Sequence, residues 1–106
     1  MPFYVLYAMD KPDSLDRRLE HYAAHRAYIE ASDASQGVSV AMSGPLQTDD
    51  GTTMIGSLIL IDAPSRAAVE QFIADDPFTR EGIWDKVHIS RFHRRHMPAG
   101  PRTSRL

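Results

Sequence analysis

The positions of apolar residues along the chain predict an alternation of strands and helices. Aromatic and β-branched residues dominate residues 3–9, which is typical of a buried strand. Apolar residues recur at helical spacing in 14–29 and again in 67–76, where Pro77 discourages continuation of the helix. The remaining elements expected from the pattern are strands at 38–43, 54–61 and 86–92 and an irregular or single-turn segment at 79–85.

Short polar segments mark the boundaries of these elements. Asp13 or Ser14 is expected to cap the first helix. Residues 34–37 are expected to end that helix, with Gly37 in the left-handed conformation. Residues 47–51 predict a hairpin turn, because an Asp-Gly pair tolerates positive φ.

The order strand, helix, strand, strand, helix, strand predicts an α+β, ferredoxin-like antiparallel sheet with both helices on one face. The strand at 54–61 is apolar at both alternating sets of positions, so the face opposite the helices is also expected to be covered. In so short a chain a second copy is the natural cover, which predicts a homodimer with two sheets packed face to face. Residues 1–96 are assigned to one domain, and the polar segment 97–106 to a disordered tail.

Composition limits the classes of function. A net charge of -2 in 106 residues gives no indication of nucleic acid or an anionic membrane as a partner. The Arg- and His-rich segment 91–96 is interpreted as a solvated strand edge and tail, with a phosphate-binding patch as the alternative. The absence of cysteine excludes disulfides and thiolate chemistry, and it is consistent with the cytoplasmic location that we expect. The longest apolar run, 58–61, is too short to span a bilayer.

Two polar residues occupy unexpected positions. His25 falls on the flank of the first helical stripe, beside Arg18, Tyr22 and Ile29. Asp76 extends the apolar stripe of the second helix by one turn, where a carboxylate meets the negative end of the helix dipole. A histidine and a carboxylate that meet can exchange protons near neutral pH. The alternatives are a solvated surface histidine and an aspartate that caps the following turn.

Other residues are weaker candidates. Ser57 interrupts an apolar strand, and its buried hydroxyl needs a partner, either a ligand or only a backbone carbonyl. Gly44 and Pro45 are interpreted as a turn or bulge whose backbone can line a pocket. His21 and His25 have the i,i+4 spacing of a metal site, but no carboxylate clearly joins them. No metal and no cofactor are therefore expected.

Several short motifs follow one another in order over about the first 95 residues. They are the strand 3–8, Arg18-Leu19 followed by His25, Gly44-Pro45-Leu46, Gly56-Ser57, and Asp76-Pro77-Phe78 with Gly82. This ordered set resembles the YciI-like (YCII-related) family of small dimeric α+β barrel proteins. The resemblance implies a dimer of ferredoxin-like units. It also implies a cleft that holds a histidine of the first helix and the aspartate of the Asp-Pro motif, here His25 and Asp76.

The resemblance also implies chemistry on small molecules. Some members act as lyases or dehydrohalogenases on ring compounds, and a related barrel family contains muconolactone isomerases. Ser57, Gly44, Pro45 and Phe78 are accordingly predicted to contact a substrate. Two departures bear on the charge preference of the pocket: Tyr22 stands where many members have an arginine, and Glu81 stands where a small residue is usual.

These observations predict acid-base catalysis on a small, cyclic molecule. Asp76 would orient His25, whose second ring nitrogen would remove or deliver a proton. An alternative is a ligand-binding or accessory module that uses the same cleft without chemistry. A dimerisation module without a ligand is the third possibility, and it predicts a cleft filled by side chains.

Overall fold

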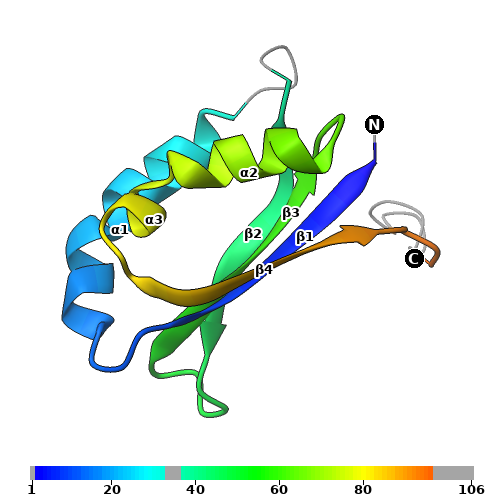
Figure 1. Ribbon diagram of the computed structural model, residues 1–106. Coiled ribbons are helices and arrows are strands. Elements are labelled where there is room, and N and C mark those ends of the chain that lie inside the picture. The colour runs from blue at the N-terminus through cyan, green and yellow to red at the C-terminus, as the bar shows by residue number, and fades with distance from the viewer. Residues whose placement is uncertain (1, 33–36, 97–106) are drawn as a thin grey trace, which may run out of the picture.

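The computed structural model describes residues 2–32 and 37–96. Four antiparallel strands form one sheet in the order β2-β3-β1-β4, and the helices lie on one of its faces (Figure 1). This arrangement confirms the predicted ferredoxin-like α+β fold. The predicted disordered tail, 97–106, lies outside the described residues. The elements are β1 (Phe3–Asp10), α1 (Leu15–Glu30), β2 (Ser39–Gln47), β3 (Met54–Asp62), α2 (Arg66–Ala74), α3 (Pro77–Arg80) and β4 (Trp84–Phe92).

The core lies between the sheet and the helices. Alternate residues of β1, Tyr4 and Leu6, are buried on this side and pair with Ile61 and Ile59 of β3. Burial of such side chains is the main favourable term in folding. The helical layer and the start of β4 contribute the rest of the buried apolar cluster, including Ile29, Val69, Ile73, Phe78, Ile83 and Trp84.

The first helix is shorter at its C-terminus than expected. Ser14 occupies the N-cap position but its side chain makes no capping hydrogen bond, and Asp13 has a φ of 57° and does not cap. The helix ends at Glu30 rather than at 34–37, and the N–H groups of Ala31 and Ser32 close its last turn on the carbonyls of Ala27 and Ile29. Gly37 does have positive φ, 97°, but it lies two residues before the start of β2 instead of ending the helix.

Gly44 and Pro45 lie within β2 and do not form the turn that we expected. The proline is tolerated because β2 is an edge strand. On the outer side of an edge strand, a backbone N–H has no neighbouring strand to donate to, so its loss costs no ladder hydrogen bond. The expected bulge character is found nearby, as the β2–β3 register shifts between Val40 and Met42 and again after Leu46. The hairpin turn is confirmed, with Gly51 at a φ of 74°.

Asp76 connects the second helix to a short third one. The helix α2 ends at Ala74, and Asp76 has extended backbone angles, φ -66° and ψ 134°. Pro77 then begins α3, a position that suits its fixed φ and its missing N–H. The single turn therefore starts at Pro77 instead of Thr79, and β4 starts at Trp84 rather than at Lys86.

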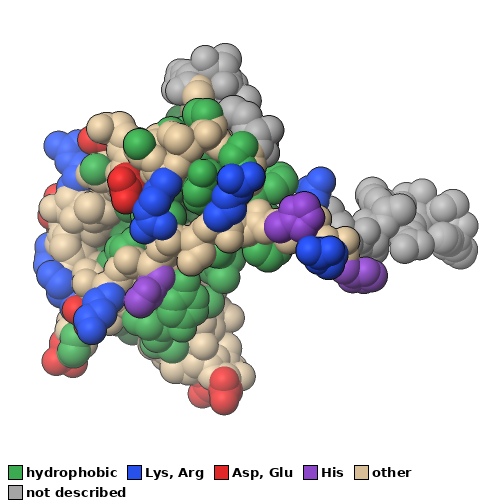
Figure 2. All heavy atoms as spheres, turned by 45° about the vertical axis from the view of Figure 1, so that its right-hand side comes forward, with side chains coloured by type: hydrophobic (Ala, Val, Ile, Leu, Met, Phe, Trp, Pro, Cys, Tyr) green, Lys and Arg blue, Asp and Glu red, His purple; other side chains and the backbone are tan. Residues whose placement is uncertain are grey.

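The opposite face of the sheet carries no helix and is apolar. Figure 2 shows hydrophobic side chains gathered beside β4 on this side of the molecule. Tyr7, Met42 and Phe92 remain 43%, 60% and 42% exposed. Among the described residues, no helix has the length and apolar character needed to cross a membrane.

Candidate active site

The histidine of the first helix meets the aspartate between the second and third helices. His25 Nδ1 lies 2.8 Å from Asp76 Oδ1, although the residues are 51 positions apart in the sequence. Both side chains are buried, so the hydrogen bond is sheltered from water. A carboxylate accepts hydrogen bonds, so Nδ1 is assigned as the donor, and in the neutral form of the ring Nε2 is an acceptor.

Asp76 is held in place from two directions. Its Oδ1 atom also accepts a hydrogen bond of 2.9 Å from the backbone N–H of Phe78, which caps α3. The two interpretations of this residue, a helix cap and the partner of a histidine, are therefore both correct. The carboxylate is fully buried, and its Oδ2 atom has no hydrogen-bond partner among the described residues.

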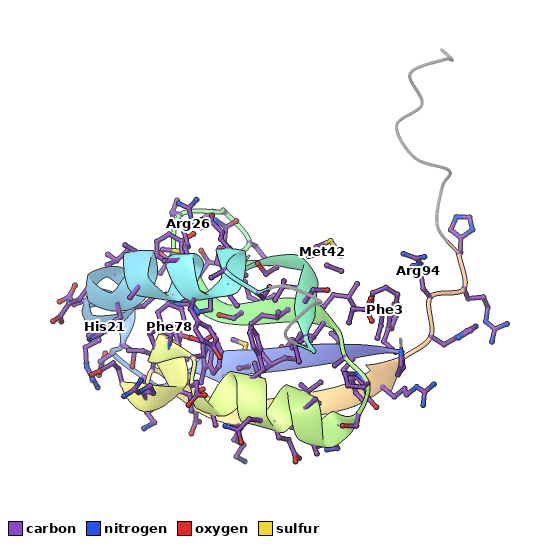
Figure 3. The ribbon with its side chains drawn as sticks, turned by 90° about the horizontal axis from the view of Figure 1, so that it is seen from above. Phe3, His21, Arg26, Met42, Phe78 and Arg94 are labelled. Atoms are coloured by element: carbon purple, nitrogen blue, oxygen red, sulfur yellow. The ribbon has the colours of Figure 1, made fainter. Side chains whose placement is uncertain are left out.

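Aromatic rings fix the plane of the imidazole. The ring of Phe78 stacks on His25 with 4.0 Å between centroids and 5° between planes, and Trp84 presents an edge at 6.1 Å. Phe78 belongs to α3, its ring packs against residues of α1 (Figure 3), and it is completely buried. It therefore supports His25 from behind and does not line the cavity described below.

Arg18 is the site residue that the sequence reasoning left out. Its side chain is only 1% exposed and forms a bidentate pair with Asp10, with Nε–Oδ2 and Nη2–Oδ1 distances of 2.6 and 2.9 Å. Nη2 also donates to Ser57 Oγ at 2.7 Å and to the carbonyl of Gly56 at 2.8 Å. Two sequence features could have identified Arg18 as a site residue: its position on the same helical flank as His25, and its place in the motif Arg18-Leu19.

Ser57 has hydrogen-bond donors on two sides. Its Oγ atom accepts from Arg18 Nη2 and, at 3.1 Å, from the indole N–H of Trp84. In the sheet Ser57 pairs with Ala8 of β1 and with Pro45 of β2. The hydroxyl that interrupts this apolar strand is therefore anchored by side chains rather than by the backbone carbonyl considered above.

A cavity of about 260 Å³ opens where α1 faces the edge of the sheet. We call it the site cavity. It is not filled by side chains, and it brings together most of the residues predicted to bind a substrate. The helix contributes Arg18, Tyr22, His25, Arg26, Ile29 and Glu30, and the strands contribute Ser43, Gly44, Pro45 and Ser57.

The two departures from the family pattern have different positions. Tyr22 lines the site cavity. Glu81 does not: its carboxylate lies 3.6 Å from Arg17 Nη2 and from His21 Nε2, outside the cavity lining. Within the described residues, no three His, Asp or Glu side chains are grouped so that they could hold a metal ion.

A partly buried tyrosine of α1, Tyr28, is influenced by the charges of Asp75 and Asp76. Tyr28 donates a 2.6 Å hydrogen bond to the carbonyl of Phe72. Burial raises the pKa of the Tyr28 hydroxyl, and the negative charges of Asp75 and Asp76 raise this pKa further. The phenol therefore stays neutral and works as a structural donor behind the site.

The fold and the site together define a class: ferredoxin-like α+β proteins with a partly enclosed cavity beside a buried His–Asp pair. Residues 2–93 match the model of the YCII-related domain. The chain belongs to this family, as the motifs indicated.

Individual relatives support this assignment. The YciI protein of Escherichia coli O6:H1 is 29% identical over 94 residues, covering 84% of this chain and 94% of the relative. Among solved structures, 5-chloro-2-hydroxyhydroquinone dehydrochlorinase of Burkholderia phenoliruptrix AC1100, in complex with 2,5-dihydroxybenzoquinone, is 30% identical with a TM-score of 0.73. That match covers 86% of this chain and 93% of the other. A conserved protein of Methanosarcina mazei Go1, 12% identical with a TM-score of 0.55 over 90% of this chain and 94% of its own, shares the fold alone.

Proposed function

We propose that the protein is a cofactor-independent enzyme that moves a proton on a small, cyclic molecule, as a lyase, dehydrohalogenase or isomerase does. The observation that carries this proposal is the 2.8 Å contact between His25 and a fully buried Asp76 at the wall of an open cavity. A neighbour of this fold with 30% identity is a dehydrochlorinase that was seen with a quinone, which supports chemistry on a ring compound.

In the proposed reaction, Nε2 of His25 removes a proton from a substrate carbon. The electron pair of the broken C–H bond forms a new double bond. In an elimination, a halide then leaves with the pair of its own bond, whereas in an isomerisation the proton returns at another carbon. Asp76 stabilises the imidazolium that forms and holds the ring in one tautomer. Such a positioned base contributes about 10²–10⁴-fold to the rate.

The other parts of the site have supporting roles in this proposal. Phe78 keeps the imidazole plane fixed through its parallel stack. Ser57, Gly44 and Pro45 line the cavity and contact the substrate. A homodimer belongs to the same proposal, because the apolar face of the sheet is left without helices.

The experiment begins with a screen for turnover of small cyclic acids, lactones and halogenated phenols. For any hit, His25→Ala and Asp76→Asn are each expected to lower kcat by about 10²–10⁴-fold. The double variant is expected to lose little more than either single one, because the two residues act as a unit. Circular dichroism checks that each variant keeps its fold.

One outcome replaces this function with another. If His25→Ala turns over every hit as fast as the wild type, the acid-base role is wrong. The cavity would then belong to a ligand-binding module, which is the alternative that the sequence left open.

A further inference from the structure

Two hydrogen-bond donors that line the site cavity have hydrogens without an acceptor among the described residues. The first is the hydroxyl of Ser57. A serine oxygen has two acceptor positions and one O–H donor. The guanidinium of Arg18 and the indole of Trp84, which lie 2.7 and 3.1 Å from Ser57 Oγ, are donors only, so neither can accept the hydroxyl hydrogen. The hydroxyl hydrogen must therefore point elsewhere, and Ser57 lines the cavity.

The second donor belongs to Arg18. Its Nε and Nη2 atoms make all of its hydrogen bonds to Asp10, Gly56 and Ser57. Nη1 has no hydrogen-bond partner among the described residues. Arg18 also lines the cavity, so this nitrogen is the part of the side chain that remains for a ligand. The carbon of the guanidinium lies 4.6 Å from the centroid of Phe78, which fixes the plane of the group.

We propose that Ser57 Oγ–H and Arg18 Nη1–H together bind a substrate oxygen that carries negative charge, or that gains it when His25 removes a proton. This inference rests on the proposed function and adds the substrate class: a ring compound with a phenolate, or with a carbonyl next to the carbon that loses its proton. In the second case the C–H pair forms a C=C bond, and the carbonyl π pair moves onto the oxygen as an enolate.

The electrostatics favour hydrogen bonding over net charge as the source of this preference. Asp10 neutralises Arg18, and Glu30 lies 3.4 Å from Arg26 at the cavity wall. Among the described residues that line the cavity, neither arginine is therefore left without a nearby carboxylate. Donors that are already oriented stabilise charge where it develops, and they need no rearrangement during the reaction. The two accepted hydrogen bonds also polarise the Ser57 hydroxyl toward donation.

The test compares ligands that differ only in the acidic oxygen. The probes are 4-nitrophenol against 4-nitroanisole, and 2,5-dihydroxybenzoquinone against its dimethyl ether, at mildly alkaline pH where the acids are ionised. The wild type is expected to bind each acid more tightly than its ether. Ser57→Ala is expected to reduce this preference about tenfold or more, because a hydrogen bond to a charged group is lost. Ser57→Thr retains the hydroxyl and should retain the preference.

Further variants keep the inference testable if Ser57→Ala does not fold. Arg18→Lys keeps a positive charge next to Asp10 but lacks the planar fork, so it should also reduce the preference. His25→Ala separates this inference from the proposed function, because it should lower kcat by about 10²–10⁴-fold and still bind the acids more tightly than the ethers. The inference is overturned if the wild type binds acid and ether equally, if it binds neither acid, or if folded Ser57→Ala and Arg18→Lys keep the full preference.

Discussion

Arg18 and His25 lie seven positions apart on α1, and their side chains reach different partners. His25 uses a carboxylate from the α2–α3 connection, whereas Arg18 uses Asp10 at the end of β1. Both contacts are buried, and each leaves one end of the side chain for the site cavity. At the scale of single residues, the site therefore consists of two supported polar groups on one helical flank.

The Arg18–Asp10 pair is predicted to be essential for stability as well as for the site. Arg18→Met leaves the Asp10 carboxylate nearly buried without its counter-charge, which is expected to lower the free energy of unfolding by about 3–5 kcal/mol. Urea unfolding followed by circular dichroism measures this loss. Arg17→Met is the control, because Arg17 is exposed and its pairing with Glu81 is expected to contribute at most about 1 kcal/mol. Equal losses in the two variants would contradict the assignment.

At the scale of elements, close contact between β3 and β1 depends on a glycine. A Cβ atom at Gly56 would lie 2.5 Å from the carbonyl oxygen of Ala8, which is backbone and cannot move away easily. Gly56→Ala is predicted to destabilise the fold by about 1–3 kcal/mol, since overpacking displaces the strands. It should also disturb Arg18, because the Gly56 carbonyl accepts one of its hydrogen bonds.

The same substitution in the neighbouring strand provides the control. A Cβ atom at Gly44 would meet no atom within 4 Å. Gly44→Ala is therefore expected to change the free energy of unfolding by no more than about 0.5 kcal/mol. Thermal unfolding of both variants measures the difference. A Gly56→Ala protein as stable as Gly44→Ala would show that the two strands are not packed this closely.

The β2–β3 hairpin carries a carboxylate whose charge supports the turn. Hydrogen bonds from the Thr48 hydroxyl and from the backbone and hydroxyl of Thr52 lower the pKa of Asp50. Because the folded pKa lies below the unfolded one, the stabilisation is present above the unfolded pKa and is lost as pH falls through the folded pKa. The difference in free energy of unfolding between the wild type and Asp50→Ala should therefore decrease as the pH becomes acid.

Denaturant midpoints at neutral and acid pH test this prediction. Asp49→Ala is the matched control, since Asp49 is exposed and its side chain accepts no hydrogen bond from the described residues. At neutral pH, the difference in stability between the wild type and Asp49→Ala should be smaller than that between the wild type and Asp50→Ala. A difference between wild type and Asp50→Ala that grows as the pH falls would refute the sign of the effect.

At the scale of the whole molecule, the open face of the sheet exposes several large apolar side chains. Rows of side chains cross the strands, with Met42 beside Leu60 and Leu58 beside Tyr7. An exposed apolar sheet face of this kind promotes aggregation of a monomer, and it is suited to association with a second copy of the chain. We therefore expect a dimer in solution at micromolar concentration.

Light scattering should give a mass near twice that of the chain, and Tyr7→Lys or Met42→Lys should shift it toward the monomer. Leu19→Lys is the control, because Leu19 is 52% exposed but lies on α1 rather than on the sheet. It should leave the mass unchanged. A monomer mass for the wild type would remove the dimer from the proposal.

The sequence by itself determined the order of the elements, the two faces of the sheet and the flank on which His25 lies. Each of these depends on local periodicity, which is written in residues close together along the chain. The C-terminal end of the first helix and the place of Gly44 and Pro45 were predicted wrongly. Gly44 and Pro45 are paired with β3, and this strand pairing overrides their local turn preference.

Only the tertiary structure decided how the site is assembled. It joined Asp10, Arg18 and Ser57 through hydrogen bonds across three elements, and it placed Phe78 behind His25 instead of in the cavity. No local pattern encodes such contacts, since they depend on which distant side chains come within hydrogen-bond reach. Arg18 shows this most clearly. In the sequence it is one of several polar residues of a helix, and its role depends on Asp10 and Ser57, which only folding brings within hydrogen-bond reach.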